Sequence, residues 1–89
     1  MSRQLLRSGT AIGANIREAQ NAQSKPDFIH KLSIAQKECD ETQYRLELLH
    51  QSGYLDPGDF SNLHHDAREI LKMLRSSILT TKNKLKINS

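Results

Sequence analysis

The hydrophobic positions of this chain repeat at helical spacing over three segments, and nowhere do they alternate as a strand would require. The clearest segment runs from about residue 25 to 52, where apolar or small residues recur at alternating steps of four and three. These positions are Phe28, Leu32, Ala35, Cys39, Thr42, Leu46 and Leu49. A sustained seam of this kind predicts a long amphipathic helix that packs at the shallow crossing angle of helical bundles.

Two further segments show helical periodicity. Between about residues 57 and 84 the seam comprises Phe60, Leu63, Ala67, Ile70, Leu74, Ser77 and Thr81, widened by Leu71, Ile78 and Leu85. The first segment, about residues 2–22, gathers Leu5, Ile12, Ile16 and Ala19 on one side. We therefore expect helices over about 2–22, 25–52 and 57–84, a frayed tail at 85–89, and a single helical-bundle domain over 1–89.

Two short polar stretches separate the predicted helices. In NAQSKPD, Ser24 is placed to cap a helix that has Pro26 near its start. In QSGYLDPGD, Gly53 is suited to end a helix in the left-handed conformation, and Asp56 is suited to cap the next one, with Pro57 at its first position. Long helices joined by such short loops predict an all-α fold, an antiparallel up-down helical bundle.

Composition narrows the class of protein. The chain has 89 residues, 36% of them hydrophobic, and no Trp, which gives one small domain with a thin core and makes partner chains an expectation. The single cysteine, Cys39, excludes an internal disulfide and suits a reducing cytoplasm. No apolar run reaches the ~18–20 residues that cross a bilayer, so we expect a cytoplasmic protein without a membrane partner.

The first segment contains two glycines four residues apart, Gly9 and Gly13, inside a predicted helix. Each costs a helix interior about 1 kcal/mol relative to Ala. The compensation we expect is a groove that lets another helix backbone approach closely. Arg7 and Arg17 interrupt the segment, so the membrane interpretation of Gly-x-x-x-Gly does not apply. No Gly-Lys-Ser/Thr follows, which disfavours a phosphate-binding loop.

Basic residues concentrate at the two ends of the chain, around an acidic middle, and the net charge is +3. On the first segment, Arg3, Arg7 and Arg17 align opposite the apolar stripe. On the third, five cations cluster beside the stripe: Arg68, Lys72, Arg75, Lys82 and Lys86. Either ridge alone fits a solvated surface, but together they favour salt-sensitive contact with nucleic-acid phosphates. No aromatic residue is interleaved with the arginines, so base stacking has no evident platform.

The middle segment has a second face, well away from its seam. Ile34, Tyr44 and Leu48 lie there among polar residues. Scattered apolar residues are ordinary on a surface, but this row adds a tyrosine to two aliphatic residues along one side. We expect a subunit interface at this face, with plain exposure as the alternative.

No catalytic or metal-binding constellation emerges from the candidate side chains, which are Cys39, His30, His50, His64, His65, Glu38, Asp40 and Glu41. The cysteine lies on an apolar seam, where a thiol is usually a small buried hydrophobe without the cationic neighbour of a nucleophile. The adjacent histidines point about 100° apart on a helix. The acids lack the Glu-x-x-His pattern of di-iron bundles. We expect a non-enzyme without metal, cofactor or small-molecule substrate.

Three stretches resemble a known bacterial family: QLLRSGTAIGANIREAQ at 4–20, DFIHKLSIAQKECDETQYRLELL at 27–49 and GYL at 53–55. They are similar to the four-helix-bundle proteins encoded in intervening sequences of 23S ribosomal RNA genes, and to the accessory variability determinant of diversity-generating retroelements. The resemblance covers most of residues 3–80. It implies an up-down bundle that forms a homo-oligomer, a ring-shaped homopentamer. From the retroelement relatives it implies a basic barrel that engages nucleic acid or a reverse transcriptase.

The resemblance implies packing and polar-network roles for its signature positions: Ser8, Gly9, Ile12, Gly13, Ala14, Asn15, Asp27, Phe28, Lys31, Leu32, Glu38, Glu41 and Thr42. Asn15 and Glu18 are expected to form interhelical or intersubunit hydrogen bonds. Family members begin with a helix of several turns ahead of QLLRSG, whereas this sequence starts almost on that motif. We therefore expect three long helices of the four, and association that covers the exposed apolar strip.

Two functions from different classes follow from these patterns. The leading hypothesis is a non-catalytic, oligomeric helical-bundle protein that binds nucleic acid, RNA or DNA, or a nucleic-acid enzyme, through its basic helix faces. The alternative is a structural or protein-binding module whose positive charge only aids solubility. A third hypothesis, a metal-dependent enzyme, requires a bound metal.

Overall fold

The chain forms three α-helices joined by two short loops. The computed structural model describes the backbone of residues 3–88 and the side chains of residues 9–86. Helix α1 spans Arg3–Gln20, α2 spans Lys25–Gln51 and α3 spans Pro57–Asn88. No strand occurs within residues 3–88, which confirms the all-α class. Residues 85–88, which were expected to form a frayed tail, instead continue α3. None of the described helices is long and apolar enough to span a bilayer.

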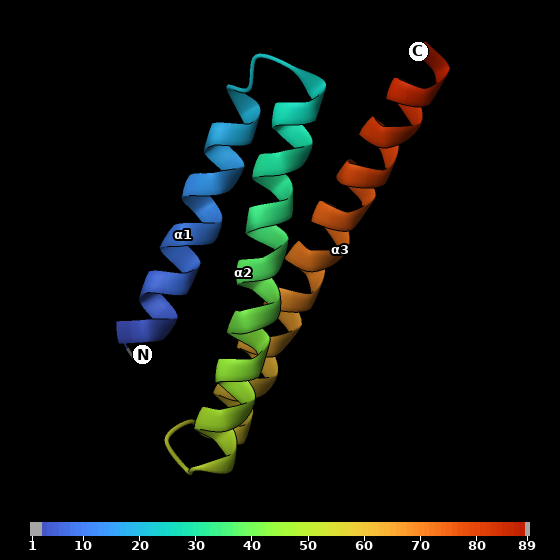
Figure 1. The fold of residues 1–89 in the computed structure, drawn as a ribbon. Helices are drawn as coiled ribbons and strands as arrows, with labels where there is room; N and C mark the ends of the chain where they lie inside the picture. Colours follow the sequence, from blue (N-terminus) through green and yellow to red (C-terminus); the bar gives the residue numbers. More distant parts are fainter. Residues whose placement is uncertain (1–2, 89) are drawn as a thin grey trace.

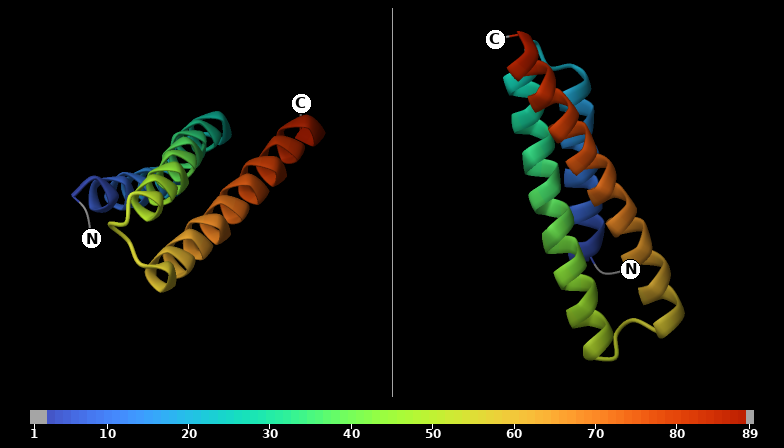
Figure 2. Two further views of the ribbon diagram at one scale, coloured as in Figure 1. Left: turned by 90° about the horizontal axis from the view of Figure 1, so that it is seen from below. Right: turned by 90° about the vertical axis from the view of Figure 1, so that its right-hand side faces the viewer.

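Helix α2 lies between the other two helices. Helix α1 packs along one side of α2 and α3 along another, and the chain reverses direction at each loop (Figure 1). Helix α3 crosses α2 obliquely (Figure 2). Within the described residues, no Cα atom of α1 lies within 8 Å of a Cα atom of α3. The result is an elongated array, 51 Å along its longest axis, with an open side between α1 and α3.

Local signals begin and end the helices where the sequence predicts. At the start of α2, the Ser24 hydroxyl accepts a hydrogen bond from the backbone N–H of Asp27 at 3.2 Å. Gly53 adopts φ +79° after α2, a left-handed conformation that glycine reaches without strain. At the start of α3, the Asp56 carboxylate accepts from the backbone N–H of Asp59 at 2.8 Å, which holds the pKa of Asp56 below its usual value. These caps satisfy helix-end groups and fix both loops.

All three helices contribute to one hydrophobic core, whose buried members are Ile12, Ala19, Leu32, Ala35, Cys39, Leu71, Leu74 and Ile78. The α2 seam is confirmed, since each seam position from residue 32 to 46 is buried and Phe28 and Leu49 are half-buried. On α3 the buried stripe is shifted from the predicted seam. Leu71 and Ile78 are buried, whereas Ser77 is exposed because it faces the open side between α1 and α3.

The two glycines of α1 have no close neighbour among the described residues outside their own helix backbone. Gly9 and Gly13 are exposed, and a methyl group added at either Cα would meet no atom within 4 Å. The close helix packing expected at this pair is therefore absent from the described part of the chain. Helical spacing places Gly9, Gly13, Ile16 and Gln20 along one edge of α1, and the last two border the open side. Sequence spacing identified the edge but not what lies beside it.

Candidate functional site

The buried stripe of α3 separates two flanks that carry different side chains. The stripe is formed by Ala67, Leu71, Leu74 and Ile78. On the side of α1, the helix presents Met73 and Ser77, which we call the groove flank. On the other side, next to α2, it presents Arg68, Lys72 and Arg75, which with Lys82 and Lys86 we call the basic flank. Each flank borders a separate depression in the surface.

A hollow of about 320 Å³ lies between α2 and α3 at the basic flank. It is lined by Asp40 and Gln43 of α2 and by Arg68, Leu71, Lys72 and Arg75 of α3. Steps of four and three residues place the three cations on one ridge of their helix. The fold therefore brings three of the predicted phosphate-binding residues together around a single depression, which we call the basic hollow.

The cations of the basic hollow carry charge that the fold does not neutralise. Neither Arg68 nor Arg75 has a carboxylate within 4.0 Å among the described residues. The Lys72 Nζ lies 3.4 Å from Glu69 Oε1, but both side chains are more than half exposed. An ion pair this exposed contributes at most about 1 kcal/mol. The hollow is therefore an electropositive site open to an anion.

Gln43 lines the hollow and carries a hydrogen-bond donor that has no partner among the described residues. Its amide nitrogen Nε2 is buried from solvent and has no hydrogen-bond partner in the described part of the chain. A buried donor without an acceptor costs about 1–3 kcal/mol, so an acceptor that reached it would be favoured. Sequence patterns did not indicate Gln43 or Asp40 as neighbours of the cations, because their position beside α3 depends on how α3 crosses α2.

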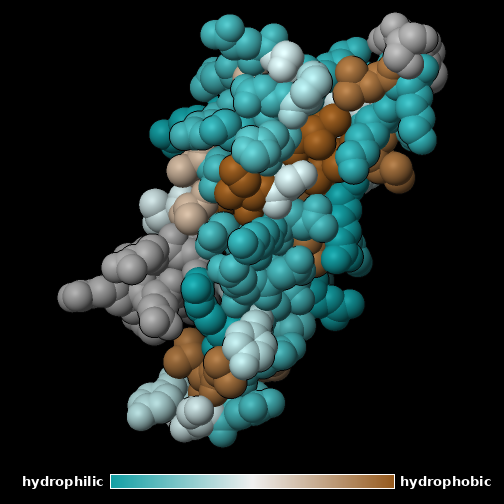
Figure 3. All heavy atoms as spheres, in the orientation of Figure 1, coloured by the Kyte–Doolittle hydropathy of each residue, from teal (hydrophilic) through white to brown (hydrophobic). Residues whose placement is uncertain are grey.

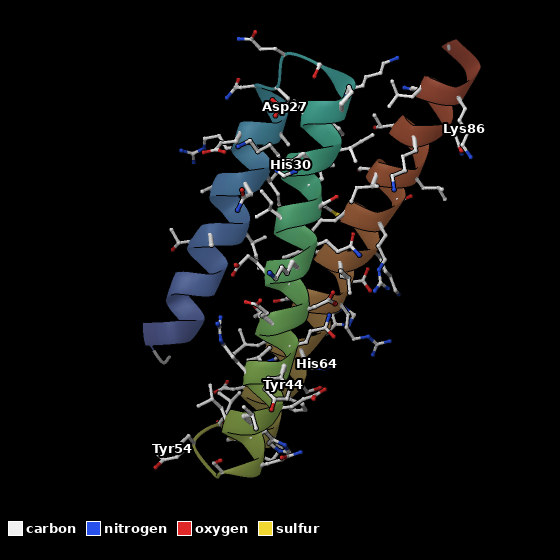
Figure 4. All side chains as sticks on the ribbon, in the orientation of Figure 1. Asp27, His30, Tyr44, Tyr54, His64 and Lys86 are labelled. Atoms are coloured by element: carbon white, nitrogen blue, oxygen red, sulfur yellow. The ribbon has the colours of Figure 1, made fainter. Side chains whose placement is uncertain are left out.

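Lys82 and Lys86 continue the basic flank toward the C-terminal end of α3, beyond the hollow. Both are exposed, and Figure 4 shows Lys86 projecting outward near the end of the helix. Leu79 interrupts this row of cations and is 61% exposed. Figure 3 shows hydrophobic residues at the surface along the upper part of the boundary between α2 and α3. The basic flank is therefore a row of cations beside apolar surface.

The basic ridge predicted on α1 does not join the basic flank. Arg17 is exposed, but no Cα atom of α1 lies within 8 Å of one of α3 in the described residues, and Arg17 does not line the basic hollow. Arg3 and Arg7 belong to α1 by their backbone, and their side chains lie outside the described residues. Of the cations predicted to act together, the structure brings together the members on α3.

The open side between α1 and α3 forms an apolar groove of about 160 Å³. Its lining residues are Ile16, Ala19, Gln20, Phe28, Leu32, Met73, Leu74 and Ser77. Met73 is 62% exposed despite its long apolar side chain. Gly9 and Gly13 extend the α1 edge of the groove without side chains of their own. The groove flank thus borders apolar surface that no described residue of this chain covers.

Comparison with known proteins identifies the family. The sequence profile of the 23S rRNA-intervening sequence proteins matches residues 1–76. The chain belongs to this family. It is similar to a crystal structure from Bacteroides thetaiotaomicron VPI-5482, a protein with unknown function from the S23 ribosomal protein family, with 55% sequence identity and a TM-score of 0.83. That similarity covers 88% of this chain and 72% of the other, and no protein with a curated description matches.

Membership in the 23S rRNA-intervening sequence family confirms the resemblance inferred from the sequence motifs. The matched residues 1–76 include the whole basic hollow and the whole glycine edge of α1. Lys82 and Lys86 lie beyond the matched range. The residues of the hollow therefore lie within the range that matches the family, whereas the C-terminal end of the basic flank lies outside it.

In this intervening-sequence family member, the predicted polar network between α1 and α2 is partly present. Lys31 Nζ lies 3.0 Å from Glu18 Oε2, which confirms an interhelical role for Glu18, and the hydrogen bond and charge of Glu18 raise the pKa of Lys31. Asn15 instead donates within its own helix, to the Ala11 carbonyl at 2.9 Å. Ile12 is 6% exposed and packs in the core of the chain.

The outer face of α2 carries the residues predicted as a subunit interface. Tyr44 is 62% exposed and Leu48 44% exposed, whereas Ile34 is half-buried. Figure 4 shows Tyr44 on the surface of α2, and Tyr54 projecting from the following loop. Two large apolar side chains thus lie on one exposed face, and an interface role for them stays a prediction.

The candidate catalytic and metal-binding groups are spread through the fold. Among the described residues, no three His, Cys, Asp or Glu side chains are placed to hold a metal ion. Cys39 is fully buried, and burial raises the pKa of its thiol. His50 stacks on Phe60 with ring centroids 4.3 Å apart. His64 lies between α2 and α3, with Nε2 3.5 Å from Glu47 Oε1 (Figure 4).

Proposed function

We propose that this chain is a non-catalytic nucleic-acid-binding protein whose basic flank contacts the phosphates of RNA or DNA, alone or together with a nucleic-acid enzyme. The observation that carries the proposal is the basic hollow, which three cations line and where Arg68 and Arg75 have no carboxylate within 4.0 Å among the described residues. Such groups attract a polyanion and release its counterions. A reverse transcriptase is the enzyme partner implied by the resemblance to retroelement proteins. The proposal assigns no catalytic residue, cofactor or small-molecule substrate.

The charge distribution along α3 supports this proposal. From Ile70 to Ser89 the sequence has five basic residues and no acid, so the charge does not cancel along the helix. Contacts to phosphates position a protein on nucleic acid but carry no sequence information. Binding is therefore expected to be salt-sensitive and largely independent of base sequence. Leu79 adds an apolar surface beside the cations for contact with bases or sugars.

The experiment compares two triple variants that remove the same charge. One changes Arg68, Lys72 and Arg75 to Ser, and the control changes the α1 ridge in the same way: Arg3, Arg7 and Arg17. Fluorescence anisotropy with labelled oligouridine and duplex DNA, over a salt series, measures binding. Charged hydrogen bonds contribute about 1.5–3 kcal/mol each, so the α3 variant should bind about tenfold or more weakly than wild type. Equal weakening by both variants, or no wild-type binding at low salt, would contradict the proposal.

We also infer that the chain assembles with copies of itself, so that a helix of a second copy fills the apolar groove. The resulting unit would be an antiparallel up-down four-helix bundle, with the added helix diagonally opposite α2. Support comes from the separation of α1 and α3, from the apolar lining and from the open edge at Gly9 and Gly13. The resemblance implies a ring-shaped pentamer as the assembled state. A single monomer mass by light scattering at micromolar concentration would contradict this inference.

The second candidate function is a structural or protein-binding module with no nucleic-acid role. The exposed Tyr44 and Leu48 on the outer face of α2 favour it, because aromatic and aliphatic side chains on one face are typical of protein interfaces. This candidate predicts that wild-type protein binds neither RNA nor DNA at low salt. It also predicts that the Ser variants of either basic ridge leave its assembly unchanged.

A further inference from the structure

The basic hollow differs from a uniformly charged surface in three respects. Its three cations are held on one ridge against a second helix, so their charges converge. Its lining includes Gln43, whose amide nitrogen Nε2 is buried and has no hydrogen-bond partner among the described residues. It also includes a carboxylate, Asp40, which a surface selected only for positive charge would not place there. The first two features point to an anion held at a defined position, and the carboxylate opposes it.

We propose that the basic hollow binds a single phosphate group of a polynucleotide backbone, held by Arg68, Lys72 and Arg75 and by the amide of Gln43. The proposal rests on the nucleic-acid function proposed above and names the place where one backbone phosphate sits. The remaining cations of the basic flank, Lys82 and Lys86, contact neighbouring parts of the strand.

The arginines match the geometry of a phosphate. Arg68 and Arg75 stand about one turn to either side of Lys72 along α3, so their planar guanidinium groups reach the same anion from two directions. A guanidinium donates paired hydrogen bonds to phosphate oxygens, and lysine adds a compact charge. The three side chains are long and exposed, so they can turn toward an anion that enters the hollow. Neither arginine has to break an ion pair first.

Gln43 makes the hollow more than a cluster of charge. Its amide nitrogen lacks an acceptor in the described fold, and a phosphate oxygen drawn in by the cations supplies one. An uncharged donor senses an anion only through direct contact, whereas cations attract it at a distance. A change in affinity on substitution of Gln43 therefore indicates a phosphate in direct contact with the amide. No change indicates a strand attracted only by the cations at a distance.

Asp40 limits the affinity of the site. It is exposed at the hollow, and it is the one carboxylate among the lining residues. Its negative charge opposes a phosphate held by the three cations, so it keeps binding reversible. Removing this charge is expected to strengthen binding about twofold or more, because a unit charge a few ångströms away contributes about 1 kcal/mol even in water.

The first test replaces Gln43 by Leu, with Gln36→Leu as the matched control. Gln36 is seven residues earlier on the same face of α2 and does not line the hollow. Anisotropy with labelled oligouridine should show Gln43→Leu binding about three- to tenfold more weakly, as expected for one lost hydrogen bond. Thermal unfolding checks the fold, and replacement of an unpaired buried amide by Leu should not lower stability. Equal affinity of the two variants would overturn the proposal.

The second test measures how many phosphates the three cations contact. For single strands the slope of log K against log salt changes by about 0.7 per phosphate. If Arg68, Lys72 and Arg75 hold one phosphate, the triple Ser variant lowers the magnitude of the slope by about 0.7. A fall of about 1.4 or more would mean at least two separate phosphates and would overturn the proposal.

A third comparison and the wild-type result separate the two proposals. Asp40→Asn should strengthen binding, whereas Asp66→Asn should not, because Asp66 lies about 200° around α3 from Arg68. Equal effects of these two variants on affinity would overturn the proposal that the hollow binds a phosphate. If wild type binds with a clear salt dependence, but the Gln43→Leu affinity and the salt slope contradict a single bound phosphate, the proposal for the hollow fails. The broader nucleic-acid function then still stands. If wild type binds no oligonucleotide at low salt, both fail.

Discussion

The two flanks of α3 lie on either side of one buried stripe, yet they expose different chemical groups. The groove flank exposes apolar surface at Met73, opposite an edge of α1 that carries Gly9 and Gly13. The basic flank exposes Arg68 and Arg75, which have no carboxylate within 4.0 Å among the described residues, and it borders Gln43, whose buried amide nitrogen has no acceptor there. The buried stripe positions α3 in the fold, so the exposed residues on each flank can suit a different binding partner. One flank suits an apolar helix and the other an anion.

The largest expected effect concerns the stripe on which both flanks depend. Leu74 is 3% exposed, so Leu74→Ala removes packing from the core and should lower the free energy of unfolding by about 2–5 kcal/mol. The matched change Leu79→Ala, at a side chain that is 61% exposed, should alter it by less than about 0.5 kcal/mol. Urea denaturation followed by circular dichroism measures both. Similar losses for the two variants would show that the stripe is not the shared support.

The glycine edge gives the next largest effect, and its sign depends on the state of assembly. Because no atom lies within 4 Å of either added methyl group, Gly9→Ala with Gly13→Ala should stabilise the isolated chain by up to about 2 kcal/mol. The same methyl groups should weaken association if a helix packs against that edge. Urea denaturation at low protein concentration, with light scattering at high concentration, measures the two effects. Association as strong as wild type would argue against an interface at the glycines.

The smallest expected effect is the pH response of Cys39, which is buried in the core together with the α3 stripe. Burial raises the pKa of this thiol in the folded chain, so its contribution to stability is fully present below the unfolded-state pKa and is lost as pH rises through the folded pKa. Wild type should therefore lose more stability above about pH 9 than Cys39→Ala does. Urea denaturation at several alkaline pH values measures the difference. Parallel losses in the two proteins would contradict the buried, protonated thiol.

The sequence predicted features that depend on one helix at a time. The α2 seam, the Ser24 and Asp56 caps and the left-handed Gly53 are local, and the structure confirms them. The family resemblance is also confirmed, because its motifs lie within the matched residues 1–76. Regular spacing and capping chemistry act within a few residues, so a single sequence contains them in full.

Features that depend on how helices meet could not be predicted in the same way. Ser77 fits the α3 seam by spacing, but it faces the open side because Leu71 and Ile78 take the inner positions. Gln43 joins the cations of α3 only because the two helices cross beside it. The spacing of Gly9 and Gly13 predicts an edge of α1 that a helix can approach, but it does not predict which helix packs there. Burial of a side chain depends on both helices that pack around it. The residue pattern of one helix therefore cannot predict burial by itself.

The central claim is that the flanks of α3 act independently, one in assembly and the other in binding an anion. Sedimentation velocity with a short labelled oligouridine measures mass and binding together for Met73→Glu and Arg75→Glu. Because an unpaired buried charge costs several kcal/mol, Met73→Glu should sediment as a smaller species that still carries the oligonucleotide. Arg75→Glu should keep the wild-type mass and lose the oligonucleotide. Dissociation of Arg75→Glu, or loss of binding by Met73→Glu with its mass unchanged, would contradict the account.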